Sequence, residues 1–446
     1  MEEYIKALTE QIRCKQARAA VAREVQAHME DMLSDLKEQG MEEEEAKNKV
    51  LTEMGDPIEA GVALDRVHRP KIAWHMIALI GVLSLLGLGV QYMMKLQCPG
   101  DNFFSFSRQL MYLVAGFVLM IGMYYLDYSF FGAYGKILAV VFILFMLLQL
   151  ITGRVVNGAT FYTIGILSMS IPMLMLLYVP MYAGVLYACR GDGKKGIISS
   201  VIFLILPVWI TQRIPCMGIE IVLFLSLTIM FSIALKTGWF GKKYIKSFYG
   251  LWAVVFVVPP VALAVAIKFH VLAAYQIERM KAFLYQTDTM GAGYVNNNVR
   301  NLMGHSQLLG GQSGVDTSAI LPSVTTDFII THIITYYGIL CGVLVLALLL
   351  LLVLQIFHVT IKQKNQLGMM IGAGCGSMFG IMILIYFLEN VGALPYSFAY
   401  LPFFTTGGTG TIVTFLLLGV VLSVYKYKDV PLTVGRKKIR IKIKVQ

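Results

Sequence analysis

Charged residues are scarce in this chain of 446 residues, where Asp, Glu, Lys and Arg together make up only 14%. Soluble domains usually carry about 25% charged residues. Hydrophobic residues account for 57% and the mean hydropathy is +0.70, so the chain lacks the polar surface that a soluble body of this size needs. The composition therefore excludes a soluble protein and predicts one that crosses a membrane several times.

Cysteine is also sparse. The six cysteines form no Cys-x-x-Cys pair and no Cys/His spacing typical of a metal site, so the sequence offers no zinc or redox motif. The first residues, MEEYIKALTE, are acidic and polar, which is unlike a cleavable signal peptide. We expect the first membrane span to direct targeting.

The charge is unevenly distributed along the chain. Residues 1–71 hold 11 Lys/Arg and 16 Asp/Glu, a net of −5, whereas the remainder holds 26 and 10, a net of +16. In the second part the basic residues lie beside apolar runs, where they orient helices in a bilayer rather than form a basic face of a globular domain. We therefore expect membrane lipids as partners and no nucleic acid.

Residues 1–70 are predicted to form a small helical domain on the cytoplasmic side. Apolar residues at helical spacing indicate helices over 15–39 and 42–54, each followed by a glycine that favours a helix end. Asp-Pro at 56–57 provides an N-cap and a proline at the first helical position, which predicts a third helix to about residue 67.

Long apolar runs dominate the remainder and predict an all-α bundle of ten membrane helices over residues 73–426, because about 20 apolar residues cross the hydrocarbon layer. With the N-terminal domain inside, inner connections and tail carry 18 Lys/Arg and outer connections carry 8. This asymmetry predicts a multi-pass protein of the cytoplasmic (inner) membrane with both termini in the cytoplasm. The predicted spans are 73–94, 109–126, 136–152, 160–187, 196–212, 217–235, 249–267, 328–356, 367–388 and 409–425.

Two polar segments flank the later spans. The outer loop 269–326 is too long for a simple connection and too polar to pack alone, so we expect it to fold back over the outer mouth of the bundle; an unstructured spacer is the alternative. The basic tail 427–446 is expected to lie in the cytoplasm, where it would either adhere to anionic lipid headgroups or only fix the topology.

Three segments carry a family resemblance. They are SRQLMYLVAGFVLMIGMYYLDY at 107–128, LPSVTTDFII at 321–330 and NVGALPYSFAYLPFFTTGGTG at 390–410. In this order, the segments resemble motifs of the SEDS family (shape, elongation, division and sporulation proteins), which includes FtsW, RodA and SpoVE. The resemblance covers about residues 73–426 and agrees with the independent count of ten spans.

The resemblance implies a peptidoglycan glycosyltransferase that polymerises lipid II at the outer face and releases undecaprenyl diphosphate. It also implies a class B penicillin-binding protein as partner and a catalytic carboxylate, matched here by Asp327. From the sequence alone, Asp327 begins an apolar helix that Thr325 or Thr326 could cap. A carboxylate at a helix N-terminus is stabilised by the helix dipole whatever its function, so a structural role stays open.

The leaving diphosphate requires positive groups. Among the outer arginines we expect Arg108 and Arg279 to bind substrate, with positioning against lipid headgroups as the alternative, and a divalent cation (Mg²⁺ or Mn²⁺) could assist. Gly407, Gly408 and Thr409 could admit a lipid headgroup close to backbone N–H groups; a tightly packed helix start is the alternative.

Departures from the family's pattern keep other functions open. Thr335-Tyr336 stand where the family carries paired glutamates, and QRIPCMG at 212–218 replaces QPDLGTA. A lipid-linked precursor flippase or transporter, or a non-catalytic scaffold for a transpeptidase, is therefore an alternative to the enzyme. Residues 22–57 additionally resemble a permease prefix domain, which implies an exchangeable protein–protein module.

Overall fold

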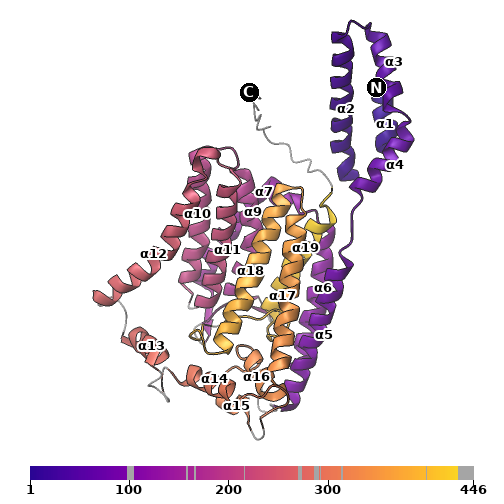
Figure 1. The fold of residues 1–446 in the computed structure, drawn as a ribbon. Helices are drawn as coiled ribbons and strands as arrows, with labels where there is room; N and C mark the ends of the chain where they lie inside the picture. Colours follow the sequence, from indigo (N-terminus) through magenta and orange to yellow (C-terminus); the bar gives the residue numbers. More distant parts are fainter. Residues whose placement is uncertain are drawn as a thin grey trace.

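The computed structural model describes residues 1–97, 105–156, 159–164, 167–214, 216–269, 274–285, 291, 293–312, 315–397 and 399–429. In this part of the chain ten helices are long and apolar enough to cross a membrane. The predicted fold class, an all-α polytopic membrane protein with ten membrane helices, is thereby confirmed. A four-helix unit at the N-terminus stands beyond one end of the bundle (Figure 1).

The N-terminal unit consists of α1 (Glu2–Glu10), α2 (Lys15–Glu38), α3 (Glu43–Met54) and α4 (Pro57–His68). Helices α2 to α4 lie where the sequence predicts them, and the Asp56 side chain caps α4 by accepting from the Ile58 N–H at 3.0 Å. Helix α1 was not predicted, although Tyr4, Leu8 and Ile12 recur every four residues. These three side chains are buried in a hydrophobic cluster separate from that of the membrane bundle.

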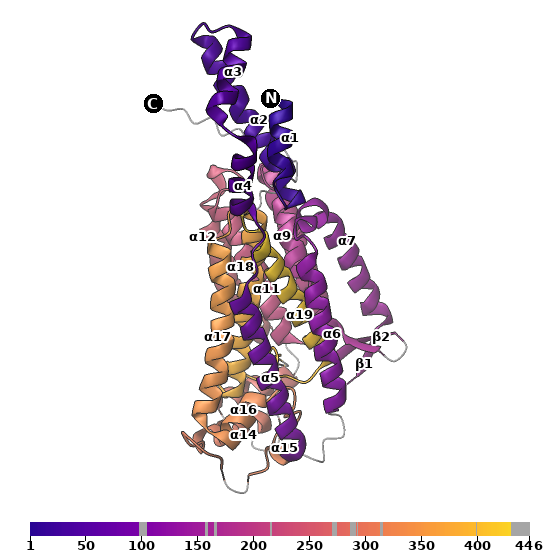
Figure 2. The ribbon, with the colours of Figure 1, turned by 90° about the vertical axis from the view of Figure 1, so that its right-hand side faces the viewer.

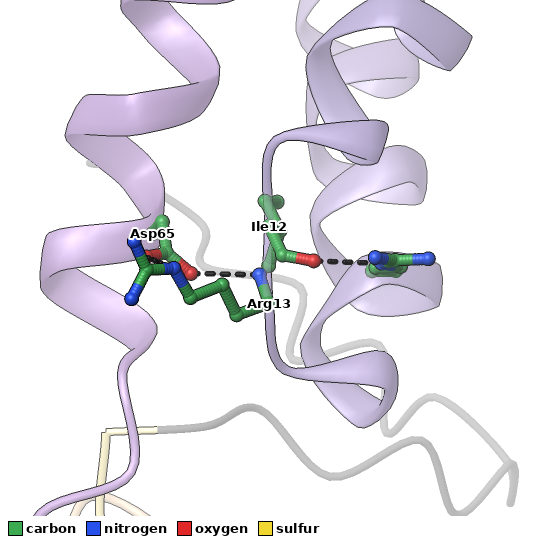
Figure 3. Close-up of polar contacts among 4 residues, drawn as sticks. Ile12, Arg13 and Asp65 are labelled. Atoms are coloured by element: carbon green, nitrogen blue, oxygen red, sulfur yellow. Dashed lines mark hydrogen bonds and ion pairs between the residues drawn. The ribbon is translucent and has the colours of Figure 1, made fainter.

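Asp65 of α4 fixes the turn between α1 and α2 (Figure 3). Its Oδ1 accepts a hydrogen bond from the Arg13 backbone N–H at 2.8 Å, and the neighbouring carbonyl of Ile12 accepts from the Arg18 Nε at 2.7 Å. The Arg13 guanidinium lies 3.9 Å from Asp65, but its side chain is 75% exposed, so this ion pair contributes little.

We therefore expect Asp65→Ala to loosen this turn because a partly buried backbone N–H loses its acceptor. Hydrogen exchange of the amides at 11–14, measured on the full-length protein in detergent, should accelerate about tenfold or more. Arg13→Gln removes only the exposed ion pair and should leave exchange nearly unchanged. Equal acceleration in both variants would show that the guanidinium, not the backbone hydrogen bond, holds the turn.

The membrane bundle contains ten spans separated mostly by short connections. Helices α18 and α19 are the most buried along their length, and α12 leans away from the other spans (Figure 1). The spans are α5 (Trp74–Gln97), α6 (Phe106–Tyr125), α7 (Ser129–Thr152), α8 with α9 (Ile171–Met175 and Tyr178–Ala188), α10 (Gly193–Gln212), α11 (Met217–Lys236), η1 with α12 (Lys242–Tyr244 and Ser247–Lys268), α17 (Ile339–Ile361), α18 (Gln366–Asn390) and α19 (Gly408–Lys426).

The predicted fourth span, 160–187, begins too early. Its first part belongs to a three-stranded antiparallel sheet of β1 (Arg154–Val156), β2 (Ala159–Ile164) and β3 (Leu167–Ser170), beside the end of α7 (Figure 2). The sheet is possible because Ile171–Ala188 already supplies 18 residues, enough to cross the hydrocarbon layer.

The predicted eighth span, 328–356, is divided in two by Gly338. The short helix α16 (Ile329–Tyr337) ends there, and α17 begins at Ile339. Gly338 has a φ of 95°, which favours glycine, and a Cβ at this position would lie 2.8 Å from the Leu308 carbonyl oxygen. The outer loop thus approaches so closely that only glycine fits, and this approach ends α16.

The described part of the segment 269–326 folds back onto the bundle. It contains α13 (Ala274–Tyr285), α14 (Tyr294–Gly304) and α15 (Thr317–Ile320), at the end of the bundle opposite the N-terminal unit (Figure 1). Arg300 of α14 donates from Nε to the Gly392 carbonyl at 2.9 Å. Further along, the Gln312 N–H donates to the Thr335 carbonyl at 3.0 Å. The loop therefore contacts both α16 and the connection between α18 and α19.

Candidate functional site

The residue that the sequence singles out, Asp327, lies in a turn rather than a helix. The turn spans 322–327, and α16 begins only at Ile329, without a side-chain cap. The expectation that Thr325 or Thr326 caps a helix with Asp327 in its first turn is therefore wrong.

Ser323 explains the difference. Its φ of 54° is uncommon for a residue other than glycine. Its carbonyl accepts from the N–H groups of Thr326 at 3.0 Å and Asp327 at 2.9 Å, and also from the Thr326 hydroxyl at 3.0 Å. The backbone therefore closes a tight turn before the helix begins, and the Thr326 hydroxyl stabilises this turn.

Neighbouring elements hold the turn through its carbonyl groups. The Thr325 carbonyl accepts from the backbone N–H and the hydroxyl of Thr406, at 3.2 and 2.9 Å. The Thr326 carbonyl accepts from the hydroxyls of Tyr386 at 3.0 Å and Thr405 at 3.2 Å. The turn is thus clamped between α18 and the α18–α19 connection.

Asn390, at the last position of α18, completes the clamp. Its Nδ2 donates to the Asp327 carbonyl and to the Tyr386 carbonyl, both at 2.9 Å. Its Oδ1 accepts from the N–H of Thr331 at 3.1 Å and from the hydroxyl of the same residue at 3.0 Å. Because Asn390 is fully buried, these bonds replace water and fix the backbone from the Asp327 carbonyl to Thr331.

The Asp327 carboxyl group is half-buried and accepts a hydrogen bond at Oδ2 from the Tyr396 hydroxyl at 2.7 Å. Burial raises the pKa of Asp327 to about 6, while hydrogen bonds from Tyr396 and Thr326 act in the opposite direction. A carboxylate with this pKa is mostly ionised at neutral pH and is more basic than an ordinary aspartate. These are the properties required of a general base.

A second carboxyl group lies close by. Glu389 is buried at the end of α18, and the Ser397 hydroxyl donates to its Oε1. Ser397 follows Tyr396 directly, and its carbonyl accepts from the Gly218 N–H at 3.2 Å. Two successive residues of the α18–α19 connection therefore each hold one carboxyl group, on Asp327 and Glu389.

Of Arg108, the predicted substrate-binding residue, and its neighbour Gln109, only the glutamine bonds to the α18–α19 connection in the described contacts. Arg108 is exposed, whereas Gln109 is buried. The Gln109 side chain accepts from the Gly407 N–H at 3.1 Å and donates to the Thr411 hydroxyl at 3.0 Å. Successive helical residues point about 100° apart, so only one member of the pair can face inward.

Residues 407–409, the predicted headgroup site, contact other parts of the protein. The Gly407 N–H bonds to Gln109, and a Cβ on Gly408 would lie 2.6 Å from the ring of Tyr112. The Thr409 hydroxyl accepts from the Ser170 N–H at 2.9 Å. These contacts are those of a tightly packed helix start, and binding of a headgroup by Gly407, Gly408 and Thr409 stays a prediction.

The described contacts do not include one between Asp327 and either of the predicted substrate-binding arginines, Arg108 and Arg279. The Arg279 side chain lies outside the described residues, although its backbone belongs to α13. Among the described residues no Lys or Arg forms an ion pair with Asp327. Arg300, the outer arginine tied to the α18–α19 connection, donates to backbone carbonyls and stacks 4.9 Å from the Phe283 ring.

The predicted divalent cation has few protein ligands available in the described part of the chain. No group of three or more His, Cys, Asp or Glu side chains occurs there. Mg²⁺ is commonly bound by one or two carboxylates together with substrate phosphates and water, and Asp327 and Glu389 could supply at most that number.

Sequence reasoning missed Tyr396, Glu389 and Asn390 as parts of the site. Asn390 and Tyr396 lie within the 390–410 motif, and Glu389 directly precedes it. The polar pair Glu389-Asn390 at the end of an apolar span was the feature that could have indicated a site. Burying such side chains costs free energy unless they have hydrogen-bond partners. The partners of Asn390 and Tyr396 in the turn and in α16, however, lie 59 to 69 residues away in the chain.

Together, the fold and site define a multi-pass membrane protein with a clamped, half-buried carboxylate at one end of its bundle. The sequence model of the cell cycle proteins FtsW, RodA and SpoVE matches residues 68–430. The chain belongs to this family, as the three motifs indicate.

Two relatives illustrate the similarity. The probable peptidoglycan glycosyltransferase FtsW of Nitrosomonas europaea is 25% identical over 364 residues, covering 77% of this chain and 90% of the relative. Stage V sporulation protein E of Bacillus subtilis is 25% identical over 334 residues, covering 73% and 88%.

Solved structures show the same fold. A chain of a peptidoglycan synthase complex that coordinates polymerization and crosslinking matches with a TM-score of 0.64 and 19% identity, covering 79% of this chain and 97% of that chain. RodA of Thermus thermophilus matches with a TM-score of 0.55 and 18% identity, covering 80% and 97%.

Proposed function

We propose that this protein is a peptidoglycan glycosyltransferase that polymerises lipid II. The observation that carries the proposal is Asp327 of the TDFI motif, whose half-buried carboxyl group is held by Tyr396. Asp327 lies in the turn just before α16, and α16 is at the end of the bundle opposite the N-terminal unit (Figure 1). Membership of the FtsW, RodA and SpoVE family supports it.

In the proposed reaction Asp327 acts as the general base. Its carboxylate takes the proton from the GlcNAc 4-hydroxyl of one lipid II molecule as that oxygen attacks the MurNAc anomeric carbon of another chain. The bond from this carbon to the diphosphate breaks, and undecaprenyl diphosphate leaves. A base with a pKa of about 6 is ionised at neutral pH and still able to hold the transferred proton.

The leaving diphosphate develops negative charge that must be stabilised. We assign this role to Arg108 and Arg279, with backbone and hydroxyl groups at 407–409 holding the headgroup; a divalent cation held by Asp327 and Glu389 would supply further positive charge for the leaving group. None of these groups replaces Asp327, because each acts on the leaving group.

The proposed topology places the N-terminal unit in the cytoplasm and Asp327 at the outer face of the cytoplasmic membrane. In support of one shared side for both parts, Asp429 after α19 contacts the N-terminal unit, where its carbonyl bonds to the His68 Nδ1 at 2.7 Å. A class B penicillin-binding protein is the proposed partner, since one structural neighbour belongs to a complex that couples polymerization to crosslinking. Residues 1–70 are proposed to bind a further protein.

Polymerisation by the purified protein tests the proposal. In proteoliposomes with lipid II, with and without Mg²⁺ or Mn²⁺, we expect glycan strands that lysozyme digests. Movement of lipid II between leaflets without polymer would favour a flippase. Absence of both activities, in the presence of a class B penicillin-binding protein as well, would favour a scaffold.

A further inference from the structure

Tyr396 contacts Asp327 in two ways. Its hydroxyl donates to Asp327 Oδ2 at 2.7 Å, and its ring packs against that of Phe328 with centroids 5.3 Å apart. Phe328 is buried and directly follows Asp327. The tyrosine therefore contacts both the carboxyl group of Asp327 and the side chain of the next residue.

The backbone that carries Tyr396 is itself fixed from three sides. Ser397 bonds to Glu389 of α18 and, through its carbonyl, to the Gly218 N–H of α11. On the other side, α14 reaches the same segment where the Asn296 Nδ2 donates to the Leu394 carbonyl at 3.4 Å. The hydroxyl of Tyr396 is thus presented to Asp327 from a rigid support.

We propose that Tyr396 is the positioning residue of the Asp327 base: its hydroxyl fixes the plane of the carboxyl group and favours the ionised form. The inference rests on the proposed glycosyltransferase function. Tyr396 acts through Asp327 and is not required to touch the substrate.

Among the described residues, no Lys or Arg forms an ion pair with Asp327. The titratable groups that face it among the described residues are Tyr386 and Glu389 from α18, Cys216 before α11 and Tyr396 itself. Tyr386 interacts with the backbone, accepting from the Ile329 N–H and donating to the Thr326 carbonyl, both at 3.0 Å. Stabilisation of the anion therefore depends on neutral donors, chiefly Tyr396.

The protonation state of Tyr396 suits this role. Burial, together with the adjacent Asp327 carboxylate, raises the pKa of Tyr396 well above its ordinary value. The hydroxyl therefore keeps its proton throughout the working pH range and always acts as the donor.

Tyr396→Phe removes the donor and retains the ring on Phe328. A hydrogen bond to a charged group is worth about one to two pH units, so the acid limb of the pH–rate profile for polymerisation should move upward by that amount from a midpoint near pH 6. At pH 6.5 the rate should fall about tenfold, and above pH 8 it should recover to within a few-fold of the unaltered protein.

Tyr386→Phe is the matched control, because it removes a hydroxyl from the same site. This hydroxyl bonds to the backbone groups of Ile329 and Thr326 and to the Thr405 hydroxyl, and none of the described hydrogen bonds joins it to the Asp327 carboxyl group. If the hydroxyls only stabilised the structure, both variants would be slower at every pH. The pH at which the rate falls to half on the acid side would then be unchanged in both. Only a donor to the carboxylate moves the limb, so we expect a shift for Tyr396→Phe alone.

The pKa of Asp327 can also be read without turnover. Infrared titration of the carboxyl C=O band, assigned by its absence in Asp327→Asn, should show the same upward shift in Tyr396→Phe. An unchanged midpoint in both measurements overturns the role of Tyr396, whereas the proposed function stands if Asp327→Asn abolishes polymerisation. If the unaltered protein makes no polymer, the proposed function fails and the infrared titration still decides whether Tyr396 sets the pKa.

Discussion

Replacing Asp327 by asparagine is expected to lower the rate of lipid II polymerisation by about 10²–10⁴-fold, the usual contribution of a positioned general base. Asparagine keeps the size of the side chain and can still accept from the Tyr396 hydroxyl, but it cannot take a proton. The backbone contacts of the turn, which involve the carbonyls of residues 325–327, should persist. The measurement is the initial rate of glycan synthesis in proteoliposomes.

The same carboxyl group sets the expected pH dependence of the unaltered enzyme. Because burial raises the pKa of Asp327 to about 6, the base is ionised and active above this pH and becomes protonated and inactive as the pH falls below it. Two results would contradict the assignment: polymerisation in Asp327→Asn at the rate of the unaltered protein, or a rate independent of pH between 5 and 7.

Replacing Asn390 by alanine is expected to lower the free energy of unfolding by about 3–5 kcal/mol. The change removes a fully buried side chain that bonds to Asp327, Tyr386 and Thr331. A buried polar group left without its partner costs about 1–3 kcal/mol, and several lose their partner here. The polymerisation rate should also fall, since the backbone of Asp327 loses its support.

Asn365, which precedes the first residue of α18, provides the matched control. Its side chain accepts from the Leu367 N–H at 3.2 Å, and loss of such a cap costs about 1 kcal/mol. Unfolding in mixed micelles, followed for both variants, should separate the two effects. A loss for Asn390→Ala no greater than for Asn365→Ala would show that the buried network does not hold the turn.

The number of membrane spans could be predicted because it depends on local composition. A run of about 20 apolar residues has one favourable state in a bilayer, since only a helix satisfies its backbone hydrogen bonds internally. Helix ends before Gly40 and Gly55 could be predicted for a similar local reason, because both glycines adopt positive φ.

The hydropathy of consecutive residues did not predict that the eighth span is divided at Gly338, or that a sheet forms at 154–170. Glycine is frequent inside membrane helices, so its presence in an apolar run does not indicate an end. The break depends on Leu308, whose carbonyl oxygen approaches Gly338 from 30 positions earlier in the chain. The sheet depends on strand pairing, such as Phe161 opposite Ser170, which hydropathy does not report.

The sequence by itself determined the ten-helix architecture and the family, and it singled out Asp327 as a candidate, because apolar length and short ordered motifs are properties of consecutive residues. Only the tertiary structure decided that Tyr396, 69 positions away, donates to this carboxylate, and that Gln109 rather than Arg108 faces the α18–α19 connection. A buried carboxyl group acquires its basicity from the donors and the exclusion of water around it. Those surroundings exist only once α16, α18 and the α18–α19 connection have packed together.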